Sequence, residues 1–267
     1  MLICVMVCLM TVRIRTNSRV TFLDVGQGDC ICVELKSGET YIFDCGSSSR
    51  RNVGEYVLLP YLKYRGIQKL NAVFISHDDV DHRNGVDELM ILGPNEGIEI
   101  ECLYAPGDIR KGDGWTTENG SFQCLHPEQG EPVGDNASSQ CFFVELNENG
   151  INLRILLTGD VEKEGETELI STIQEVQKKN VGINNLDVLK VAHHGSAYSS
   201  RDALLELIRP KVAVISCGRN NSYGHPHKET LQRLEKIGSQ VVVTTDGGAI
   251  TLESVDKGWE LHTFLQD

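Results

Sequence analysis

The stretch Ser76-His77-Asp78-Asp79-Val80-Asp81-His82 directly follows the apolar run Ala72-Val73-Phe74-Ile75. It places two histidines and three carboxylates at the point where a predicted strand ends in a loop. Neutral imidazoles and carboxylates are ligands for divalent metals such as Zn²⁺, Mn²⁺ or Fe²⁺. The stretch therefore predicts a metal site at the edge of a sheet.

The spacing within this stretch bears on how many metals it could serve. In an extended segment, His77 and Asp79 share a face, whereas the adjacent Asp81 and His82 point to different sides. Such an arrangement can serve two neighbouring metals. The alternative is a solvated acidic loop that caps a helix beginning near Asn84, with Asp81 at the positive end of the helix dipole.

Polar groups end several other apolar runs in the same way. They are Asp44, Asp160, the pair His193 and His194, and the pair His225 and His227. A Gly-Asp pair after a strand is usually a turn, and a polar loop before a helix explains Gly-His-Pro-His as well as a function does. However, six of the eight histidines fall in three such clusters. Their joint occurrence favours one site built at several strand ends.

The composition limits the class of protein. A chain of 267 residues suffices for one large domain or two small ones, and 24% charged with 40% hydrophobic residues indicates a soluble globular body. The net charge of −13 excludes a generic basic nucleic-acid binder, so a polyanionic substrate would require local basic segments and metals. Nine cysteines, several within apolar runs, do not suggest a disulfide framework.

The N-terminus differs from the rest of the chain. Residues 1–12 are almost wholly apolar, and Arg13 and Arg15 follow. The run is shorter than the ~20 residues that span a bilayer, and it lacks the pattern of a secretory signal. We therefore divide the chain into a segment 1–15 and a body 16–267. The segment is an edge strand or, as we expect, the stub of a membrane helix. We expect the segment to pack on no part of the body.

Within the body, strands come first and mixed strands and helices follow. Helices are predicted over 53–64 and 86–92, and a hairpin is predicted from the runs 140–146 and 153–158. The stretch 106–136 is predicted to be a long loop, a type of segment that is often functional or mobile.

Taken together, these motifs resemble a metallo-β-lactamase-fold hydrolase, specifically the C-terminal domain of ComEC-type DNA-uptake proteins. The segments that carry the resemblance are Phe22 to Asp29, the histidine and aspartate loop at 76–82, Leu157 to Asp160, Lys190 to Ser196 and Asn220 to His227. They extend from about residue 20 to about residue 252 and so cover nearly the whole chain.

The resemblance implies an α+β fold, a four-layer αββα sandwich with two divalent metal ions, Mn²⁺ or Zn²⁺, at one edge. It implies that one metal is bound by His77 and Asp79, the other by Asp81, His82 and His193, and that Asp160 bridges them. The catalytic residues implied are Asp81, Asp160, His194 and His225. The residues expected to support the ligands or line the site are Asp44, Gln27, Asp29, Ser196 and Asn136.

This sequence departs from the wider family at two positions. Asp79 stands where a second histidine is usual, and the segment Asn136 to Gln140 stands where an isolated histidine is usual. Having fewer nitrogen and more oxygen ligands favours Mn²⁺ more than in a typical zinc site.

The function implied by the resemblance is a nuclease that cleaves phosphodiesters of DNA during uptake. Its substrate would be single-stranded DNA, and its partner a membrane channel or an upstream membrane domain, which would tether a soluble hydrolase domain to the membrane. The alternatives are a hydrolase of another ester, such as a lactone, thioester or phospholipid, and a non-catalytic module that binds DNA or a partner. The full set of carboxylates and histidines favours an enzyme, with the loop 106–136 expected to set substrate choice.

Overall fold

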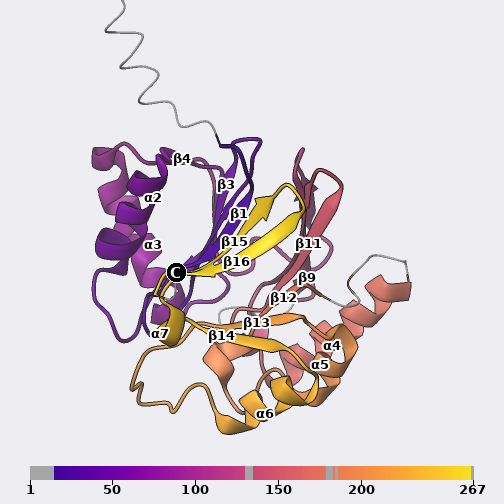
Figure 1. The fold of residues 1–267 in the computed structure, drawn as a ribbon. Coiled ribbons are helices and arrows are strands. Elements are labelled where there is room, and N and C mark those ends of the chain that lie inside the picture. Colours follow the sequence, from indigo (N-terminus) through magenta and orange to yellow (C-terminus); the bar gives the residue numbers. More distant parts are fainter. Residues whose placement is uncertain (1–14, 130–134, 179–182, 184–185, 266–267) are drawn as a thin grey trace, which may run out of the picture.

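The computed structural model describes residues 15–129, 135–178, 183 and 186–265. Two seven-stranded sheets face each other, and helices cover the outer face of each (Figure 1). This is the predicted four-layer αββα sandwich.

The first sheet has the strand order β16-β15-β1-β2-β3-β5-β7. Its antiparallel part runs from β16 to β3, and β3, β5 and β7 are parallel. The strands are β1 (Arg19–Phe22), β2 (Cys30–Glu34), β3 (Thr40–Cys45), β5 (Ala72–Phe74), β7 (Leu103–Tyr104), β15 (Ile250–Val255) and β16 (Gly258–Thr263). A separate pair is formed by β4 (Lys69–Leu70) and β6 (Glu99–Ile100).

The second sheet has the order β14-β13-β12-β11-β10-β9-β8. Strands β8 to β11 are antiparallel, and β11 to β14 are parallel. The strands are β8 (Gly114–Thr116), β9 (Gly120–His126), β10 (Cys141–Glu148), β11 (Ile151–Leu157), β12 (Val188–Lys190), β13 (Val212–Ile215) and β14 (Gln240–Val243).

The helices fall into two groups along the chain. Before β6 lie the π-helix η1 (Gly54–Leu58), α2 (Leu59–Arg65), α3 (Val80–Leu92) and the 3₁₀ helix η2 (Gly93–Glu96). After β9 lie η3 (Asn136–Ser138), α4 (Lys163–Lys178), η4 (Ala192–Gly195), α5 (Asp202–Ile208), α6 (Lys228–Lys236) and the short α7 (Thr244–Gly247).

The alternation of side chains along the strands produces three apolar layers. In β2, Ile31 and Val33 belong to the layer between the sheets, whereas Cys30 and Cys32 belong to the layer beneath α2 and α3. The layer between the sheets is rich in aromatic rings; Phe43 and Phe74, for example, stack with centroids 4.9 Å apart. Each such buried side chain stabilises the fold by roughly 1.5–3 kcal/mol.

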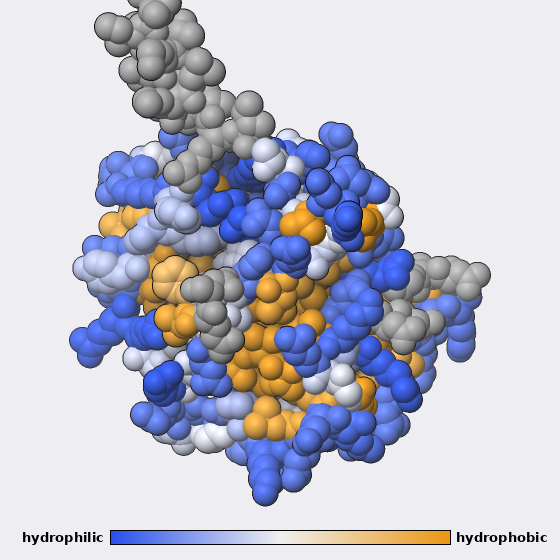
Figure 2. Space-filling view, in the orientation of Figure 1, coloured by the Kyte–Doolittle hydropathy of each residue, from blue (hydrophilic) through white to orange (hydrophobic). Residues whose placement is uncertain are grey.

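At one edge of the sandwich, the outermost strands of the two sheets are β16 and β14. Trp259 and Leu261 of β16 and Val242 of β14 are only partly buried against the core. Figure 2 shows hydrophobic residues on this face of the molecule.

Two local predictions were wrong. The helix predicted over 86–92 begins at Val80, so Asp81 and His82 lie in its first turn rather than in an extended segment. The stretch 106–136 is not one long loop, because it contains β8 and β9, and Phe122 is fully buried in the layer between the sheets. Sheet pairing with β10 therefore outweighs the polar composition of this stretch.

Other local predictions were confirmed. The hairpin is β10 and β11, and the helix predicted over 53–64 corresponds to η1 followed by α2, with Pro60 tolerated because it lies in the first turn of α2.

No disulfide joins the cysteines in the described part of the chain. No helix there is long and apolar enough to cross a membrane.

The predicted segment 1–15 lies outside the described residues except for Arg15. Its guanidinium donates hydrogen bonds to the Glu39 carbonyl at 2.8 Å and to Thr40 Oγ1 at 2.6 Å. Arg15 is thus attached to the hairpin of β2 and β3, contrary to the expectation for that residue.

Candidate metal centre

The sheet topology brings the polar groups of several strand ends together. Strands β3 and β5 are parallel, as are β11, β12 and β13, and the segments after their carboxyl ends carry the predicted site residues. Carboxyl ends of parallel strands meet at one edge of a sheet, which is where ligands bind in open α/β sheets. The helix α3 adds its first turn to the same place.

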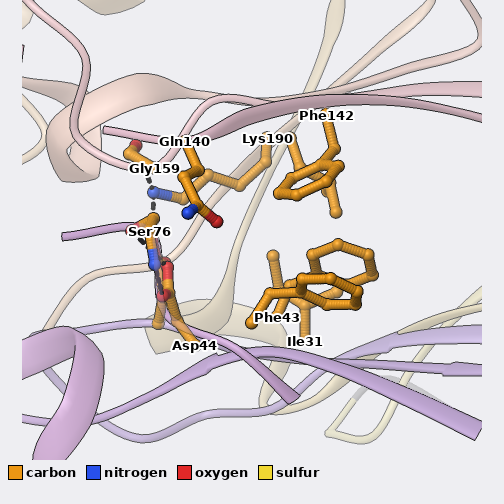
Figure 3. Close-up of a pocket in the computed structure, with 11 residues that line it drawn as sticks. Ile31, Phe43, Asp44, Ser76, Gln140, Phe142, Gly159 and Lys190 are labelled. Atoms are coloured by element: carbon orange, nitrogen blue, oxygen red, sulfur yellow. Dashed lines mark hydrogen bonds and ion pairs between the residues drawn. The ribbon is translucent and has the colours of Figure 1, made fainter. Parts of the chain in front are cut away.

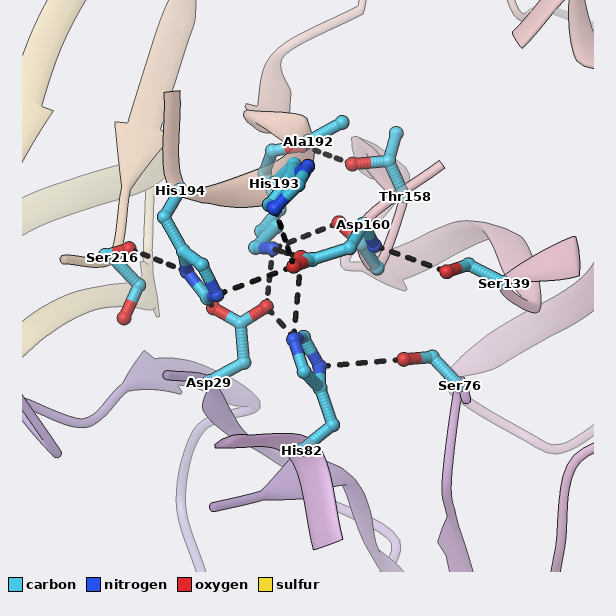
Figure 4. A network of polar contacts seen from close by, with 12 residues as sticks. Asp29, Ser76, His82, Ser139, Thr158, Asp160, Ala192, His193, His194 and Ser216 are labelled. Carbon is cyan, nitrogen blue, oxygen red and sulfur yellow. Dashed lines mark hydrogen bonds and ion pairs between the residues drawn. The ribbon is translucent and has the colours of Figure 1, made fainter. Parts of the chain in front are cut away.

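Four buried side chains form the centre of this site: Asp29, His82, Asp160 and His194 (Figure 4). Each offers a ligand atom, and these atoms lie within 4.8 Å of one another. The Nε2 atoms of His82 and His194 lie 3.2 Å and 3.3 Å from the two carboxylate oxygens of Asp160. Asp160 therefore stands between the two imidazoles.

Hydrogen bonds on the far side of each ring fix its orientation. Nδ1 of His82 donates to Asp44 Oδ2 at 2.8 Å, and Nδ1 of His194 donates to the Ser216 carbonyl at 2.8 Å. Both Nε2 atoms are buried and have no hydrogen-bond partner. A carboxylate or carbonyl on one nitrogen and an open position on the other is the usual arrangement of metal-binding histidines, so these residues fit a divalent metal.

Further predicted ligands lie beside this group. Asp81 Oδ2 is 3.6 Å from His194 Nε2. The ring centroid of His77 is 4.1 Å from that of His82, and His77 Nε2 is also buried without a hydrogen-bond partner. The same nitrogen lies 3.6 Å from Asp79 Oδ2. The structure thus brings together His77 with Asp79, which precede α3, and Asp81 with His82, which lie in its first turn.

Asp29 approaches the histidines from the opposite side. One of its oxygens lies 3.7 Å from His82 Nδ1, and the other lies 3.8 Å from His194 Nδ1. Asp29 therefore faces the Nδ1 side of both rings and not the open Nε2 atoms. It forms an ion pair with Lys190. Lys190 is fully buried, donates to the Gly159 carbonyl at 2.9 Å, and lies 3.4 Å from Asp160 Oδ1. It therefore ties Asp29 to Asp160 beneath the site.

The two adjacent histidines of η4 occupy different places. His194 belongs to the buried group, whereas the His193 side chain is 25% exposed at the rim, with Nε2 3.8 Å from Asp160 Oδ2. The resemblance implied instead that His193 is a metal ligand and His194 a catalytic residue. Both residues have left-handed backbone conformations, with φ of 49° and 53°, which sequence alone does not predict. Glu162, which sequence reasoning missed, lies 3.2 Å from His193 Nδ1.

His225 lies next to this group and is held by Gln27. The Gln27 amide oxygen accepts from the Gly218 N–H, so its Nε2 faces His225 Nδ1 at 3.3 Å. The ring centroids of His225 and His193 are 5.5 Å apart. Burial, together with repulsion from the neighbouring histidines, lowers the pKa of His225 to about 4.

Two other predicted residues take part in local hydrogen bonds. The Ser196 hydroxyl accepts from the Tyr198 N–H, and the Asn136 carbonyl accepts from the Ser139 N–H. The segment that contains Asn136 reaches the site through Ser139 instead, whose hydroxyl accepts from the Asp160 N–H at 3.2 Å.

The charges of the group depend on one another. Burial opposes charging of His82, but the carboxylates of Asp160 and Asp44 outweigh it and raise the pKa of His82 well above its ordinary value. In the same way, burial is outweighed for Asp81, and the neighbouring His194 and His82 lower its pKa to about 2. Without a metal, protons on the imidazoles balance the carboxylates. A divalent cation would replace those protons, as is usual for metal binding.

Close backbone contacts hold the first turn of α3 in place. A Cβ on Gly46 would lie 2.5 Å from the carbonyl carbon of Asp81, and a Cβ on Gly28 would lie 2.2 Å from the Gly46 carbonyl oxygen. The turn before β2, the end of β3 and the start of α3 can approach this closely only because both positions are glycine.

The site borders directly on the hydrophobic layer between the sheets. Figure 3 shows Asp44, Ser76 and Lys190 at one end of a small cavity whose other end is lined by Phe43 and Phe142. Such low-dielectric surroundings strengthen the electrostatic interactions in the site.

The sequence of this chain matches a known family over the residues that build the site. Residues 23–219 match the model of the family described as the metallo-beta-lactamase superfamily, and the chain belongs to that superfamily, whose members are generally hydrolases.

The curated relatives include proteins named for competence. The chain is 29% identical to ComE operon protein 3 of Bacillus subtilis, over 89% of this chain and 33% of that protein. It is 32% identical to Recombination protein 2 of Haemophilus influenzae (93% and 30%) and 28% identical to Competence protein ComA of Neisseria gonorrhoeae (88% and 32%). The chain spans about a third of the length of these relatives.

A solved structure has the same fold. It is that of CmlA, a diiron beta-hydroxylase from Streptomyces venezuelae, with a TM-score of 0.52 and 11% identity over 89% of this chain and 54% of that one. The comparisons therefore confirm the metallo-β-lactamase fold and the likeness to competence proteins.

Proposed function

We propose that this chain is a metal-dependent nuclease that cleaves phosphodiesters of single-stranded DNA in connection with DNA uptake. The observation that carries the proposal is the pair of buried, unpartnered Nε2 atoms of His82 and His194 on either side of Asp160. The relatives named for competence and recombination support DNA as the substrate.

Two groups of side chains would hold the metals. His77 and Asp79 would bind one, and Asp81, His82 and His194 the other, with Asp160 shared between them. When bound, two divalent cations would supply Lewis acidity and positive charge for the displacement at phosphorus. Oxygen atoms make up a large share of this ligand set, which favours Mn²⁺ as well as Zn²⁺.

The protein's own residues would prepare the site. Asp44 and the Ser216 carbonyl keep the proton of each ligand histidine on Nδ1, which leaves Nε2 free to bind. Because an amide nitrogen only donates, Gln27 Nε2 donates to His225 Nδ1. Neutral His225 thus carries its proton on Nε2, where it can donate to a phosphate oxygen or to the leaving oxygen.

The longer curated relatives suggest the setting of this reaction. Because the chain spans about a third of their length, we propose that it acts as the hydrolase domain of a membrane-associated protein, next to a channel that delivers the strand. The net charge of −13 makes such delivery important, since the chain alone would attract DNA weakly.

The test is cleavage of end-labelled single-stranded DNA with Mn²⁺, with wild type beside Asp160→Ala and the surface control Asp78→Asn. Loss of the shared carboxylate should lower cleavage by a factor on the order of 10³ or more, whereas Asp78→Asn should cleave like wild type, because Asp78 pairs with Arg83 at the surface. Equal cleavage by Asp160→Ala would identify a contaminating nuclease. If the metal-loaded wild type cleaves no DNA but hydrolyses a lactone or a thioester, the other-ester alternative replaces the proposal.

A further inference from the structure

A groove of about 700 Å³ opens directly onto the candidate metal centre. One wall is the loop after β3, from Ser47 to Asn52, and the floor includes Asp79 and Asp81, which are candidate ligands. Tyr223, from the loop after β13, contributes the other wall. A substrate in this groove would therefore extend away from the reacting bond.

The first wall offers one available positive charge. Arg50 is occupied, since its guanidinium donates to the carbonyl and the carboxylate of Asp24 at 2.8 Å and 3.0 Å. The next residue, Arg51, is exposed and has neither an ion pair nor a hydrogen bond within the part of the chain that the structure describes. In a chain with a net charge of −13, an unpaired guanidinium beside the metal ligands suits an anionic group such as a phosphate.

Tyr223 offers the groove an aromatic face. Tyr223 is 55% exposed, and its ring stacks on His225 with centroids 5.6 Å apart and planes 20° apart. One face of the tyrosine is thus supported by the imidazole, and the exposed remainder is available to a planar ligand. Bases of single-stranded nucleic acid stack on such exposed aromatic rings.

Both walls are held in place by the backbone of their loops. Asn221 accepts from the N–H groups of Tyr223 and His225 and donates to the carbonyls of Gly218 and His225. On the other wall, the Ser47 hydroxyl accepts from the N–H groups of Ser49 and Arg50, and Ser47 N–H is bonded to Asn84 of α3. The groove is therefore preorganised and needs little ordering on binding.

We propose that this groove is a subsite for single-stranded nucleic acid, in which Arg51 binds a backbone phosphate and Tyr223 stacks on the base of a neighbouring nucleotide. The proposal rests on the nuclease function proposed above, and it names how the strand is recognised. A lactone, a thioester or a phospholipid headgroup would use the arginine at most and would leave the tyrosine face without a partner.

The test compares two substrates with the Mn²⁺-loaded chain at low salt. One is a labelled oligothymidylate, and the other is bis(p-nitrophenyl) phosphate, a diester without bases. Tyr223→Ala should raise KM for the oligonucleotide about tenfold, the size expected for one lost stacking contact, and Tyr223→Phe should restore it. Arg51→Ala should also raise this KM. It should reduce the slope of log KM against log salt concentration by roughly 0.7, the contribution of one phosphate contact on a single strand. Arg51→Lys should restore most of both effects.

Two matched controls separate this effect from general damage. Tyr64→Ala removes a tyrosine that is 71% exposed but lines a different pocket, and Arg209→Ala removes an exposed arginine beside Lys211, away from the groove. Both should keep the wild-type KM for the oligonucleotide. Thermal unfolding of all variants checks that they are folded, which we expect because both altered groove side chains are exposed.

An oligonucleotide with abasic positions gives a second readout. Wild type should bind it more weakly than oligothymidylate, whereas Tyr223→Ala should not distinguish the two. If wild type cleaves oligothymidylate while Tyr223→Ala and Arg51→Ala keep its KM and its preference for bases, the subsite is wrong and the nuclease function stands. If the metal-loaded wild type cleaves no DNA, the proposed function itself fails.

Discussion

At the scale of single residues, the site depends on what lies behind each ligand. His82 is backed by the carboxylate of Asp44 and His194 by the carbonyl of Ser216, so in each ring the free nitrogen is the one that faces Asp160. Asp29 faces the other side of both rings and pairs with Lys190. Asp29 therefore supports the site from behind the rings and does not face the open Nε2 atoms.

This arrangement makes Lys190 important before any metal binds. In Lys190→Met, Asp29 and Asp160 would remain buried without their shared cation, so the free energy of unfolding in EDTA should fall by about 3–5 kcal/mol. Mn²⁺ should recover part of this loss, because it supplies positive charge at Asp160. The control Lys36→Met removes a half-exposed lysine 3.9 Å from Glu148 and should cost about 0–1 kcal/mol. Urea unfolding measures both, and equal losses would contradict this role for Lys190.

At the scale of elements, the site depends on three backbone segments in close contact. The sequence gives the residues of the 76–82 stretch but not their conformation, because a helix that begins at Val80 puts Asp81 and His82 in one helical turn. Asp79 at the N-cap and Asp81 in the first turn suit the start of a helix. The end of β3 and the turn before β2 pack closely against this turn and fix its position.

Gly46→Ala tests this contact. Its Cβ would overlap the backbone of Asp81 and His82 at 2.5 Å, so the start of α3 must move. We expect a loss of about 1–3 kcal/mol in unfolding free energy and weaker Mn²⁺ binding in a calorimetric titration. Gly93→Ala is the matched control, because Gly93 has φ of −51° and a Cβ there would meet its neighbours at ordinary distances of 3.4 Å or more. Unaltered Mn²⁺ binding by Gly46→Ala would show that the turn is free to adapt.

The contact between His126 of β9 and Ala137 of η3 should make stability depend on pH. Burial lowers the pKa of His126 to about 4, while its Nε2–H donates to the Ala137 carbonyl at 2.7 Å. The unfolded chain therefore binds more protons between about pH 4 and pH 6.5, so this contribution to stability is full above pH 6.5 and is lost as the pH falls towards 4.

At pH 5 the effect should be about 2 kcal/mol. Urea unfolding in EDTA at pH 7.5 and pH 5 should show a smaller difference for His126→Gln than for wild type. His262→Gln, at a half-exposed position on β16, should behave like wild type. A His126→Gln variant with the wild-type difference would show that His126 does not carry this dependence.

At the scale of the whole molecule, the sequence was sufficient for the sandwich and for the position of the site. Asp44, Asp160 and the histidines all follow apolar runs, and parallel strands carry such ends to one edge. It was not sufficient for β8 and β9, because this polar stretch joins the sheet through the pairing of β9 with β10 and of β8 with β9. Nor could it assign His193 and His194, because that choice depends on two left-handed residues.

The two sheets contribute different parts of the site. His77, Asp79, Asp81 and His82 follow β5, whereas Asp160 and His194 follow β11 and β12. A metal bound by both sets would join the two halves of the sandwich. Binding to the folded state alone stabilises a protein by an amount that grows with the logarithm of the ligand concentration above Kd.

The most direct test of the metal centre is anomalous diffraction from crystals grown with Mn²⁺. The account predicts a strong peak about 2.0–2.3 Å from His82 Nε2, His194 Nε2 and an Asp160 oxygen, and a second peak beside His77 and Asp79. Crystals of Asp160→Ala should lose or weaken both peaks. The account would be contradicted if wild-type crystals soaked in excess Mn²⁺ showed no anomalous peak at Asp160, or showed Mn²⁺ bound only elsewhere in the molecule.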